Sequence, residues 1–317
     1  MTKLVHVAVG VIMDNDGKIF IAKRSLDVHQ GGLWEFPGGK VDANETIQQA
    51  LVRELREELA IEVLISQPLI QIRHHYPDKS VLLDVHKITQ FSGVPCGNEG
   101  QPVQWVEPRD LKNFDFPAAN RPIIFAINLP EIYLITGDFL STSDFSERLT
   151  RALKAGVRLV QVRIENFNLS SHQVILDMVA AAVNEFAISV VINCSSSQFS
   201  QIVEAYPDIK FGLHLNGLNA NQINARPVGE GVLFGVSCHN AEEIAHAQKI
   251  GADYLLLSPV LMTQSHPETV PMGWDAFSKL TELANVPVYA LGGVDEAHLQ
   301  LAKANGAQGV AGIRAWW

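Results

Sequence analysis

Eight short runs of apolar residues, separated by segments with the period of a helix, dominate the second half of the chain. The runs cover residues 132–135, 159–162, 189–192, 211–215, 233–236, 254–257, 286–290 and 309–312. They are rich in Val, Ile and Leu, as are parallel strands that are buried on both faces of a sheet. Eight of them predict a closed, TIM-type (β/α)8 barrel, with an open doubly wound sheet as the alternative.

The first 128 residues show a different pattern, in which strand-like stretches surround one amphipathic helix. The strand-like stretches cover residues 7–13, 18–23, 63–72 and 80–89, and the turn sequence DNDG joins the first two. Residues 46–59 place Ile47, Ala50, Leu51 and Leu55 on one apolar stripe, which predicts a helix. We therefore expect an α+β domain at residues 1–128 and the barrel at residues 131–317.

Charge and composition limit the class of partner. Residues 1–130 carry 13 basic and 16 acidic side chains, and residues 131–317 carry 11 and 18, so both parts are net negative. This excess disfavours a polymeric nucleic acid as partner. No apolar run approaches the roughly 18 residues of a membrane span, and the N-terminus lacks the pattern of a signal peptide. Cys96, Cys194 and Cys238 form no C-x-x-C pair. We expect a soluble, cytoplasmic protein without a membrane segment.

Three carboxylates share one face of the predicted helix. Glu54, Glu57 and Glu58 stand at positions i, i+3 and i+4. Like charges at this spacing repel, and the arrangement becomes favourable when a hard divalent cation, Mg²⁺ or Mn²⁺, lies among the oxygens. Gly38 and Gly39, just before the helix, would let backbone carbonyls approach the same ion. A solvated acidic face without a ligand is the alternative.

The segment from Gly39 to Ile61 resembles the Nudix box, G-x5-E-x7-R-E-U-x-E-E-x-G-U, in which U is aliphatic. The one departure is Ala60, where the family has a Gly that ends the helix in a left-handed turn. Ala at this position should cost about 1 kcal/mol but touches no ligand position. The strings EFPGG (35–39), YPD (76–78), EGQP (99–102) with Trp105, and FPAAN (116–120) resemble the MutT branch of the family.

The resemblance to the MutT branch implies a pyrophosphohydrolase that uses Mg²⁺ or Mn²⁺ to convert 8-oxo-dGTP to 8-oxo-dGMP and pyrophosphate, which keeps the oxidised nucleotide out of DNA. The implied metal ligands are the Gly38 carbonyl, Glu54, Glu57, Glu58 and Glu99. Glu54 is the implied catalytic base, with Glu99 as its rival. Arg24, Phe36 and Asn120 are implied to bind substrate, and Gly39, Glu45 and Arg53 to support the Nudix box, with Glu45 paired to Arg53.

Asn120 would decide which base is accepted. Its amide offers one acceptor and two donors, and oxidised guanine carries a hydrogen on N7 where guanine has a lone pair. An Asn that accepts from N7–H and donates to O6 would leave unpaired groups with dGTP, at a cost of about 1–3 kcal/mol. The alternative is that Asn120 is a helix N-cap or a turn residue.

The second half resembles the thiamine-phosphate synthase and TenI group of barrels. The matching strings are YLITGD (133–138), QVR (161–163), GLHL (212–215), GVSCH (235–239), GADY (251–254), SPV (258–260) and LGGV (291–294). Gly292 and Gly293 follow a late strand, where such barrels hold a phosphate. His214 and His239 are either catalytic or, as we favour, buried and satisfied by backbone partners.

The catalytic positions of the synthases are replaced. Glu165 and His266 stand where two anion-binding lysines are usual, and Cys194 and Asn219 where two acidic residues are usual. TenI-type tautomerases have a His where this chain has Pro259. Synthase activity is therefore doubtful, and a barrel that binds a thiamine-phosphate-type ligand, with a regulatory role, is favoured.

Two further interpretations stay open. In the first, the Nudix domain acts on another nucleotide or on a thiamine-pathway pyrophosphate. In the second, the barrel senses a thiamine phosphate and regulates the hydrolase. Because Trp316 and Trp317 follow the eighth apolar run closely, we also expect the first domain or another subunit to cover the place of an eighth barrel helix.

Overall fold

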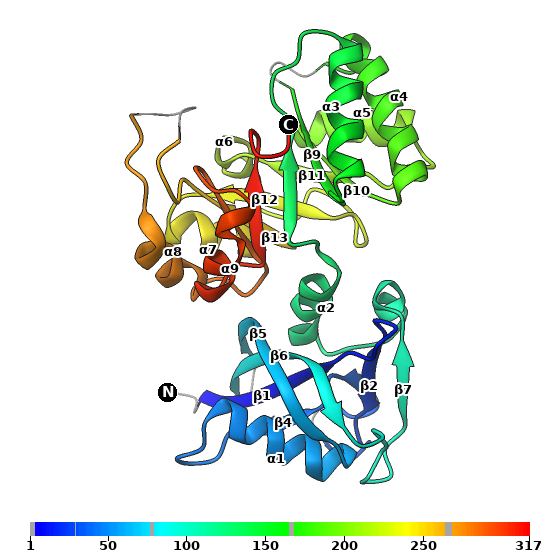
Figure 1. Cartoon of the computed structure of the whole chain (residues 1–317), viewed down its shortest axis with the longest axis vertical. Coiled ribbons are helices and arrows are strands. Elements are labelled where there is room, and N and C mark those ends of the chain that lie inside the picture. Colours follow the sequence, from blue (N-terminus) through cyan, green and yellow to red (C-terminus); the bar gives the residue numbers. More distant parts are fainter. Residues whose placement is uncertain (1–3, 29, 77–78, 165–167, 264–267) are drawn as a thin grey trace. The chain divides into compact units, whose positions relative to one another are not determined.

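The computed structural model describes residues 4–28, 30–76, 79–164, 168–263 and 268–317. The chain divides into two compact units, Met1–Asn128 and Leu129–Trp317 (Figure 1). Among the helices of the described residues, none is long and apolar enough to cross a membrane.

The first unit combines a four-stranded sheet with a three-stranded sheet. The larger sheet has the order β4 (Gly38–Lys40), β1 (Leu4–Ile12), β6 (Ser80–Ser92) and β5 (Glu62–His75). The smaller sheet has the order β3 (Trp34–Glu35), β2 (Ile19–Lys23) and β7 (Val103–Val106). The 3-10 helices η1 (Pro108–Asn113) and η2 (Ala118–Asn120) and the helix α2 (Arg121–Asn128) follow β7. The predicted α+β class is confirmed.

Helix α1 (Ile47–Leu59) packs on the larger sheet and carries the glutamates. The predicted helix included Thr46, which is instead the N-cap: its side chain accepts from the Gln49 N–H, and the Gln49 side chain accepts from the Thr46 N–H. Leu51 and Leu55 lie in a buried cluster with Ala8 of β1. This packing fixes the opposite, acidic face of the helix relative to β4.

Ala60 ends α1 in the left-handed conformation, with φ 57° and ψ 34°, and its N–H is bonded to the carbonyls of Leu55 and Arg56. The turn that Gly makes in the Nudix box is therefore kept by an Ala, as the sequence predicts.

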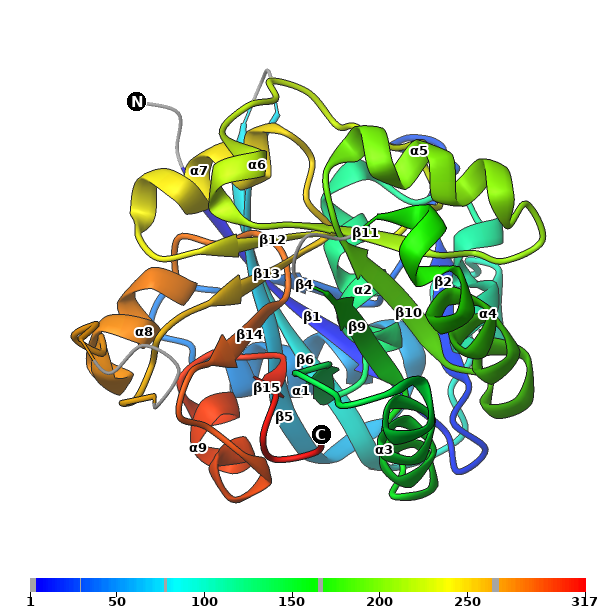
Figure 2. The ribbon, with the colours of Figure 1, turned by 90° about the horizontal axis from the view of Figure 1, so that it is seen from above.

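The second unit is a barrel of eight parallel strands in which β15 pairs with β8 and closes the ring (Figure 2). The strands are β8 (Ile132–Ile135), β9 (Leu159–Arg163), β10 (Ser189–Asn193), β11 (Gly212–Leu215), β12 (Phe234–Cys238), β13 (Tyr254–Leu257), β14 (Val288–Leu291) and β15 (Gly309–Gly312). Each predicted run coincides with one strand to within two residues, so the closed barrel is confirmed and the open sheet was the wrong alternative.

Helices surround the barrel in Figure 2 and cover the outward side chains of its strands. They are α3 (Thr142–Lys154), α4 (Leu169–Phe186), α5 (Ser196–Ala205), α6 (Gly217–Ala220), α7 (Ala241–Lys249), α8 (Gly273–Thr281) and α9 (Leu299–Ala304), with the 3-10 helix η3 (Glu296–His298) before α9. Inside the barrel, Tyr133, Tyr254 and Tyr289 are fully buried and contact one another edge to face.

The last tryptophan packs against the barrel unit itself. The Trp317 indole N–H donates to the Asp138 carbonyl at 3.1 Å, and its ring lies 5.1 Å from that of Phe145 in α3. Trp317 therefore packs beside the loop after β8 and the first turns of α3. Cover by the first domain or by another subunit stays a prediction.

Candidate functional site

Two glycines of β4 allow this strand to lie directly against the acidic face of α1. A Cβ at Gly39 would lie 2.1–2.2 Å from the carboxylate atoms of Glu54. Gly38 has φ +146°, and a Cβ there would lie 2.1 Å from the Ala8 carbonyl oxygen. The Gly38 N–H donates to Glu58 Oε2 at 3.2 Å. A side chain at Gly39 would displace Glu54, and one at Gly38 would collide with the backbone of β1.

Arg53 connects the loop before α1 to the glutamates. Its Nε and Nη2 donate to the Glu45 carboxylate at 2.9 and 2.8 Å, which is the pair that the resemblance implies. Nη2 also donates to the Lys40 carbonyl at 2.9 Å, and Nη1 donates to Glu54 Oε1 at 2.7 Å. The hydrogen bond from Arg53 lowers the pKa of Glu45. Arg53 therefore orients Glu54, a role that sequence reasoning missed.

Glu58 lies among other carboxylates. Its pKa is raised to about 8, mainly by burial and then by the charges of Glu35, Glu54 and Glu99, while the hydrogen bond from the Gly38 N–H opposes the shift. Burial also raises the pKa of Glu35, against the effect of its partner Arg24. The structure thus brings four acidic side chains from β3, α1 and the loop after β6 into one electrostatic cluster.

Glu35 is a member of this cluster that the sequence did not single out. Its carboxylate forms an ion pair with Arg24, the residue implied to hold substrate phosphate. In the sequence, the only indication that Glu35 belongs to the site was its position in the string EFPGG. Its place near Glu58 depends on how β3 lies beside α1.

Glu99 is positioned by the residues around it. Asn98 donates from its backbone N–H to the Glu58 carbonyl at 3.0 Å and from Nδ2 to the Glu57 carbonyl at 2.8 Å. Gln101 Nε2 donates to the Glu58 carbonyl at 3.1 Å, and its Oε1 accepts from the Glu99 N–H at 2.9 Å. These bonds fasten the loop to the last turn of α1. Neither Asn98 nor Gln101 was singled out from the sequence.

The cluster fits a hard divalent cation by its donor chemistry. Over the described residues, no group of three or more His, Cys, Asp or Glu side chains has the geometry to hold a metal ion. The Glu57 side chain is 60% exposed and lies 3.7 Å from Arg53 Nη1. Arg24 and Arg53 pair with Glu35 and Glu54, but burial and the neighbouring carboxylates still raise the pKa of Glu58 to about 8. A bound Mg²⁺ or Mn²⁺ would add positive charge among these oxygens.

The Phe36 side chain belongs to the core. It is 3% exposed and stacks on Phe116 with ring centroids 5.2 Å apart. A substrate cannot reach this ring without displacing it, so we limit the predicted contact of Phe36 with substrate to its backbone.

Asn120 lies at the end of η2, directly before α2, and is 8% exposed. Its Oδ1 is buried and has no hydrogen-bond partner among the residues that the structure describes. An N-cap oxygen would accept from a backbone N–H in the first turn of α2, which this atom does not do. The N-cap alternative is therefore wrong, but Asn120 is a turn residue, because it lies in η2 and its backbone N–H donates to the Pro117 carbonyl at 2.9 Å. The buried side-chain acceptor still needs another partner.

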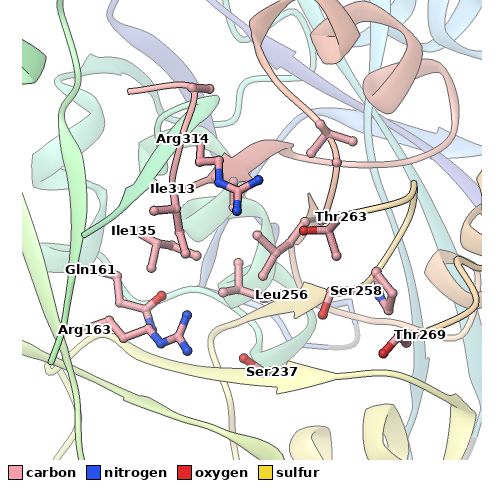
Figure 3. Close-up of a pocket in the computed structure, with 18 of the residues that line it drawn as sticks. Ile135, Gln161, Arg163, Ser237, Leu256, Ser258, Thr263, Thr269, Ile313 and Arg314 are labelled. Atoms are coloured by element: carbon pink, nitrogen blue, oxygen red, sulfur yellow. The ribbon is translucent and has the colours of Figure 1, made fainter. Parts of the chain in front are cut away.

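A cavity of about 890 Å³ opens at the carboxyl ends of the barrel strands (Figure 3). Gly292 (φ +95°) and Gly293 (φ +69°) line it, and a Cβ on either would lie under 3 Å from backbone atoms of Pro259 or Met262. In TIM-type barrels this face carries the ligand site. The predicted phosphate-binding glycines therefore line a cavity at the expected face of the barrel.

Amides line part of the cavity, but Cys194 and Asn219, which stand where synthases usually have acids, are not among its described lining residues. Asn193 and Asn216 line it, and Asn216 Oδ1 accepts from the Asn219 N–H at 2.9 Å. Cys194 is buried, where burial raises its pKa to about 12. Glu165 and His266 lie outside the described residues.

The two histidines differ from the expectation of buried rings with backbone partners. His214 is buried, but its ring nitrogens contact the Tyr254 and Ser237 hydroxyls, and burial lowers its pKa to about 3. His239 does bond to a backbone atom, with Nδ1 2.7 Å from the Ser258 carbonyl, but it is exposed. His214 is thus buried as predicted but has no backbone partner for its ring among the described residues, and His239 has a backbone partner but is not buried.

The first unit is similar to known hydrolases. Residues 8–126 match the family described as NUDIX domain. The chain is 38% identical over 122 residues to the 8-oxo-dGTP diphosphatase of Escherichia coli K12, which covers 38% of this chain and 95% of that protein. It is 36% identical over 124 residues to the CTP pyrophosphohydrolase of the same organism, covering 39% of this chain and 91% of that protein.

The second unit is similar to thiamine-phosphate synthases. Residues 132–316 match the family described as thiamine monophosphate synthase. The chain is 33% identical over 187 residues to a protein of Aquifex aeolicus named putative thiamine-phosphate synthase 2, which covers 59% of this chain and 97% of that protein.

Proposed function

The chain belongs to the Nudix hydrolases over residues 8–126 and to the thiamine monophosphate synthase family over residues 132–316, and we propose that it is a Mg²⁺-dependent 8-oxo-dGTP pyrophosphohydrolase. The products would be 8-oxo-dGMP and pyrophosphate. Such an enzyme removes oxidised dGTP from the nucleotide pool before it can be built into DNA and cause mutation. It needs neither a nucleic acid polymer nor a membrane as partner. We place it in the cytoplasm for that reason.

The observation that carries this proposal is the buried, unpartnered Oδ1 of Asn120. A buried acceptor without a donor is unfavourable by about 1–3 kcal/mol, and the N7–H of oxidised guanine is a donor that guanine lacks. The Asn120 amide would accept from N7–H and donate to O6.

The chemistry follows from the glutamate cluster. A bound Mg²⁺ would neutralise phosphate charge and make water easier to deprotonate. The Gly38 carbonyl, Glu54, Glu57, Glu58 and Glu99 would hold it, as proposed from the Nudix box. Glu54, oriented by the 2.7 Å hydrogen bond from Arg53, would take the proton from the attacking water, with Glu99 as the rival base. Arg24 would exchange its bond to Glu35 for substrate phosphate.

The test compares Asn120→Ala with the wild type on 8-oxo-dGTP, dGTP, CTP and thiamine diphosphate. Loss of about 1–3 kcal/mol of discrimination would lower the kcat/KM ratio of 8-oxo-dGTP to dGTP by about 5- to 150-fold. Asn128→Ala is the matched control, because Asn128 lies at the far end of α2 and bonds only to the Pro108 and Ile124 carbonyls. An unchanged ratio in Asn120→Ala, or a wild type that prefers CTP or thiamine diphosphate, would refute the proposal.

For the barrel we propose a binding module for a thiamine-phosphate-type compound, with Gly292 and Gly293 at the phosphate, rather than a synthase. The replacement of two usually acidic residues by Cys194 and Asn219 supports this proposal. Calorimetric titration of the full chain with thiazole phosphate, together with hydrolysis rates with and without it, would test binding and regulation separately. Formation of thiamine phosphate from its two precursors would refute the non-synthase assignment.

A further inference from the structure

The loop between β6 and β7 closes the carboxyl end of α1. The last carbonyls of a helix have no partner within the helix and need a donor from outside it. Here residues 96–101 of the loop donate to the carbonyls of Glu57, Glu58 and Leu59. Two of these three carbonyls belong to glutamates that we propose as metal ligands. The loop therefore contacts the backbone that carries these ligands.

Gln101 is the side chain that joins this end of the helix to Glu99. Its Nε2 donates to the Glu58 carbonyl at 3.1 Å, and its Oε1 accepts from the Glu99 N–H at 2.9 Å. A carboxylate at position 101 would lack the donor, and an amine would lack the acceptor. With the amide turned over, an N–H would face the Glu99 N–H and an oxygen would face the Glu58 carbonyl. The two bonds thus require an amide in this one orientation.

The turn around Glu99 leaves its backbone little freedom. The Gly100 N–H donates to the Gly97 carbonyl at 2.9 Å, so Glu99 lies in a tight turn. A Cβ at Gly97 would lie 2.0 Å from the Gln101 carbonyl oxygen, so this glycine lets the chain after the turn pass close to the chain before it. The Glu99 side chain itself is exposed. Its backbone is therefore fixed while its carboxylate stays accessible.

A fixed backbone at Glu99 favours the binding of a divalent cation. The charge of Glu99 is one of those that raise the pKa of Glu58, so the two carboxylates interact. A glutamate in a loop without such bonds would lose backbone freedom when it binds an ion, and this loss would weaken binding. The turn and the Gln101 amide restrict that freedom before an ion binds, which is preorganisation.

We infer that Gln101 is a positioning residue of the hydrolase, which holds Glu99 beside Glu58 so that both can serve as ligands of a divalent cation. The inference rests on the metal site of the proposed function and not on the choice of nucleotide. The oxygen and the nitrogen of the Gln101 amide are already engaged, so this residue acts through Glu99 rather than on the ion. That property distinguishes it from a residue that only stabilises the end of the helix.

The hydrogen bond to Glu99 is measured without a metal. In ¹⁵N-labelled full-length protein in EDTA, the Glu99 amide hydrogen should exchange about 2- to 10-fold faster in Gln101→Met than in the wild type. Methionine is close to glutamine in size and has neither the N–H nor the carbonyl. The matched control is Gln49→Met, because Gln49 caps the other end of α1 by accepting from the Thr46 N–H at 2.8 Å. An unchanged exchange rate in Gln101→Met, or the same increase in Gln49→Met, would overturn the inference.

The positioning role is measured by the affinity of the full chain for Mn²⁺ without nucleotide, from the EPR signal of the free ion. Gln101→Met should weaken binding about 2- to 10-fold, whereas Gln49→Met should bind as the wild type does. Glu99→Gln removes the carboxylate and should weaken binding at least as much. The double variant should bind no more weakly than Glu99→Gln alone, because Gln101 acts through Glu99. Losses that multiply in the double variant, or an equal loss in Gln49→Met, would overturn the inference.

These measurements separate the inference from the choice of substrate. A wild type that binds Mn²⁺ but does not prefer 8-oxo-dGTP would refute the proposed substrate, while weaker binding in Gln101→Met would still support the role of Gln101. A wild type that binds no Mn²⁺ would overturn both the proposed metal site and the positioning role.

Discussion

Replacing Gly39 by Ala tests whether the glutamate cluster is the reacting centre. The added Cβ would lie 2.2 Å from the oxygens of Glu54, whereas an ordinary contact begins at 3.4 Å, so the carboxylate must retreat by about 1.2 Å. A displacement of about 1 Å at a catalytic group costs on the order of 100-fold in rate. Gly39 is not among the glycines with positive φ, and the obstacle is the end of a flexible side chain, so the fold should tolerate the change. We therefore expect kcat for the best triphosphate substrate to fall by about 100-fold or more while the unfolding temperature stays nearly constant.

Gly17→Ala is the control for backbone strain. Gly17 has φ +83° in the hairpin turn, and a Cβ there meets nothing within 4 Å. This variant should lose about 1 kcal/mol of stability and keep its kcat. Turnover of Gly39→Ala within threefold of wild type would show that the position of Glu54 does not limit catalysis and would remove it as the base. Equal losses of activity in both variants would show that strain, not displacement, is responsible.

Three further predictions concern the cap, the buried histidine and the metal. Ala60→Gly should stabilise the first unit by about 1 kcal/mol in calorimetry, since φ 57° is unfavourable for Ala, whereas Ala155→Gly, at φ −76°, should give no gain. Burial lowers the pKa of His214 from 6.5 to about 3, so the unfolded state binds the extra proton and stability is lost as the pH falls below about 6.5. Below that point, the slope of the unfolding free energy against pH should be steeper by about 1.4 kcal/mol per pH unit in the wild type than in His214→Gln; equal slopes would contradict this prediction. EDTA should abolish hydrolysis, and Mg²⁺ or Mn²⁺ should restore it; turnover that survives EDTA would exclude the metal.

The parts of the structure that the sequence predicted are those set by local periodicity. The apolar runs mark all eight barrel strands, because a strand buried on both faces is recognisable by itself. The shared face of Glu54, Glu57 and Glu58 follows from helical spacing, and the left-handed Ala60 from the helix-ending position in the motif. None of these depends on where another segment of the chain lies.

The parts that the sequence could not predict are contacts between segments. Whether Glu35 faces Glu58 depends on the placement of β3 beside α1, and a one-residue slip of a strand turns each side chain to the other face. Gln101 contacts the end of α1 only because of the fold of its loop. Phe36 was predicted at the substrate from its neighbours in the motif, although its ring is in the core.

Hydrogen bonds inside the barrel, which join four side chains in sequence, show why such contacts also escape motif reasoning. The strings that contain Tyr133, His214, Ser237 and Tyr254 are all recognisable in the sequence, but each was assigned by itself. Closure of the barrel brings β8, β11, β12 and β13 around one interior, and only then do the hydroxyls and the imidazole meet. Contacts of this kind depend on the closure of the barrel, so no single motif predicts them.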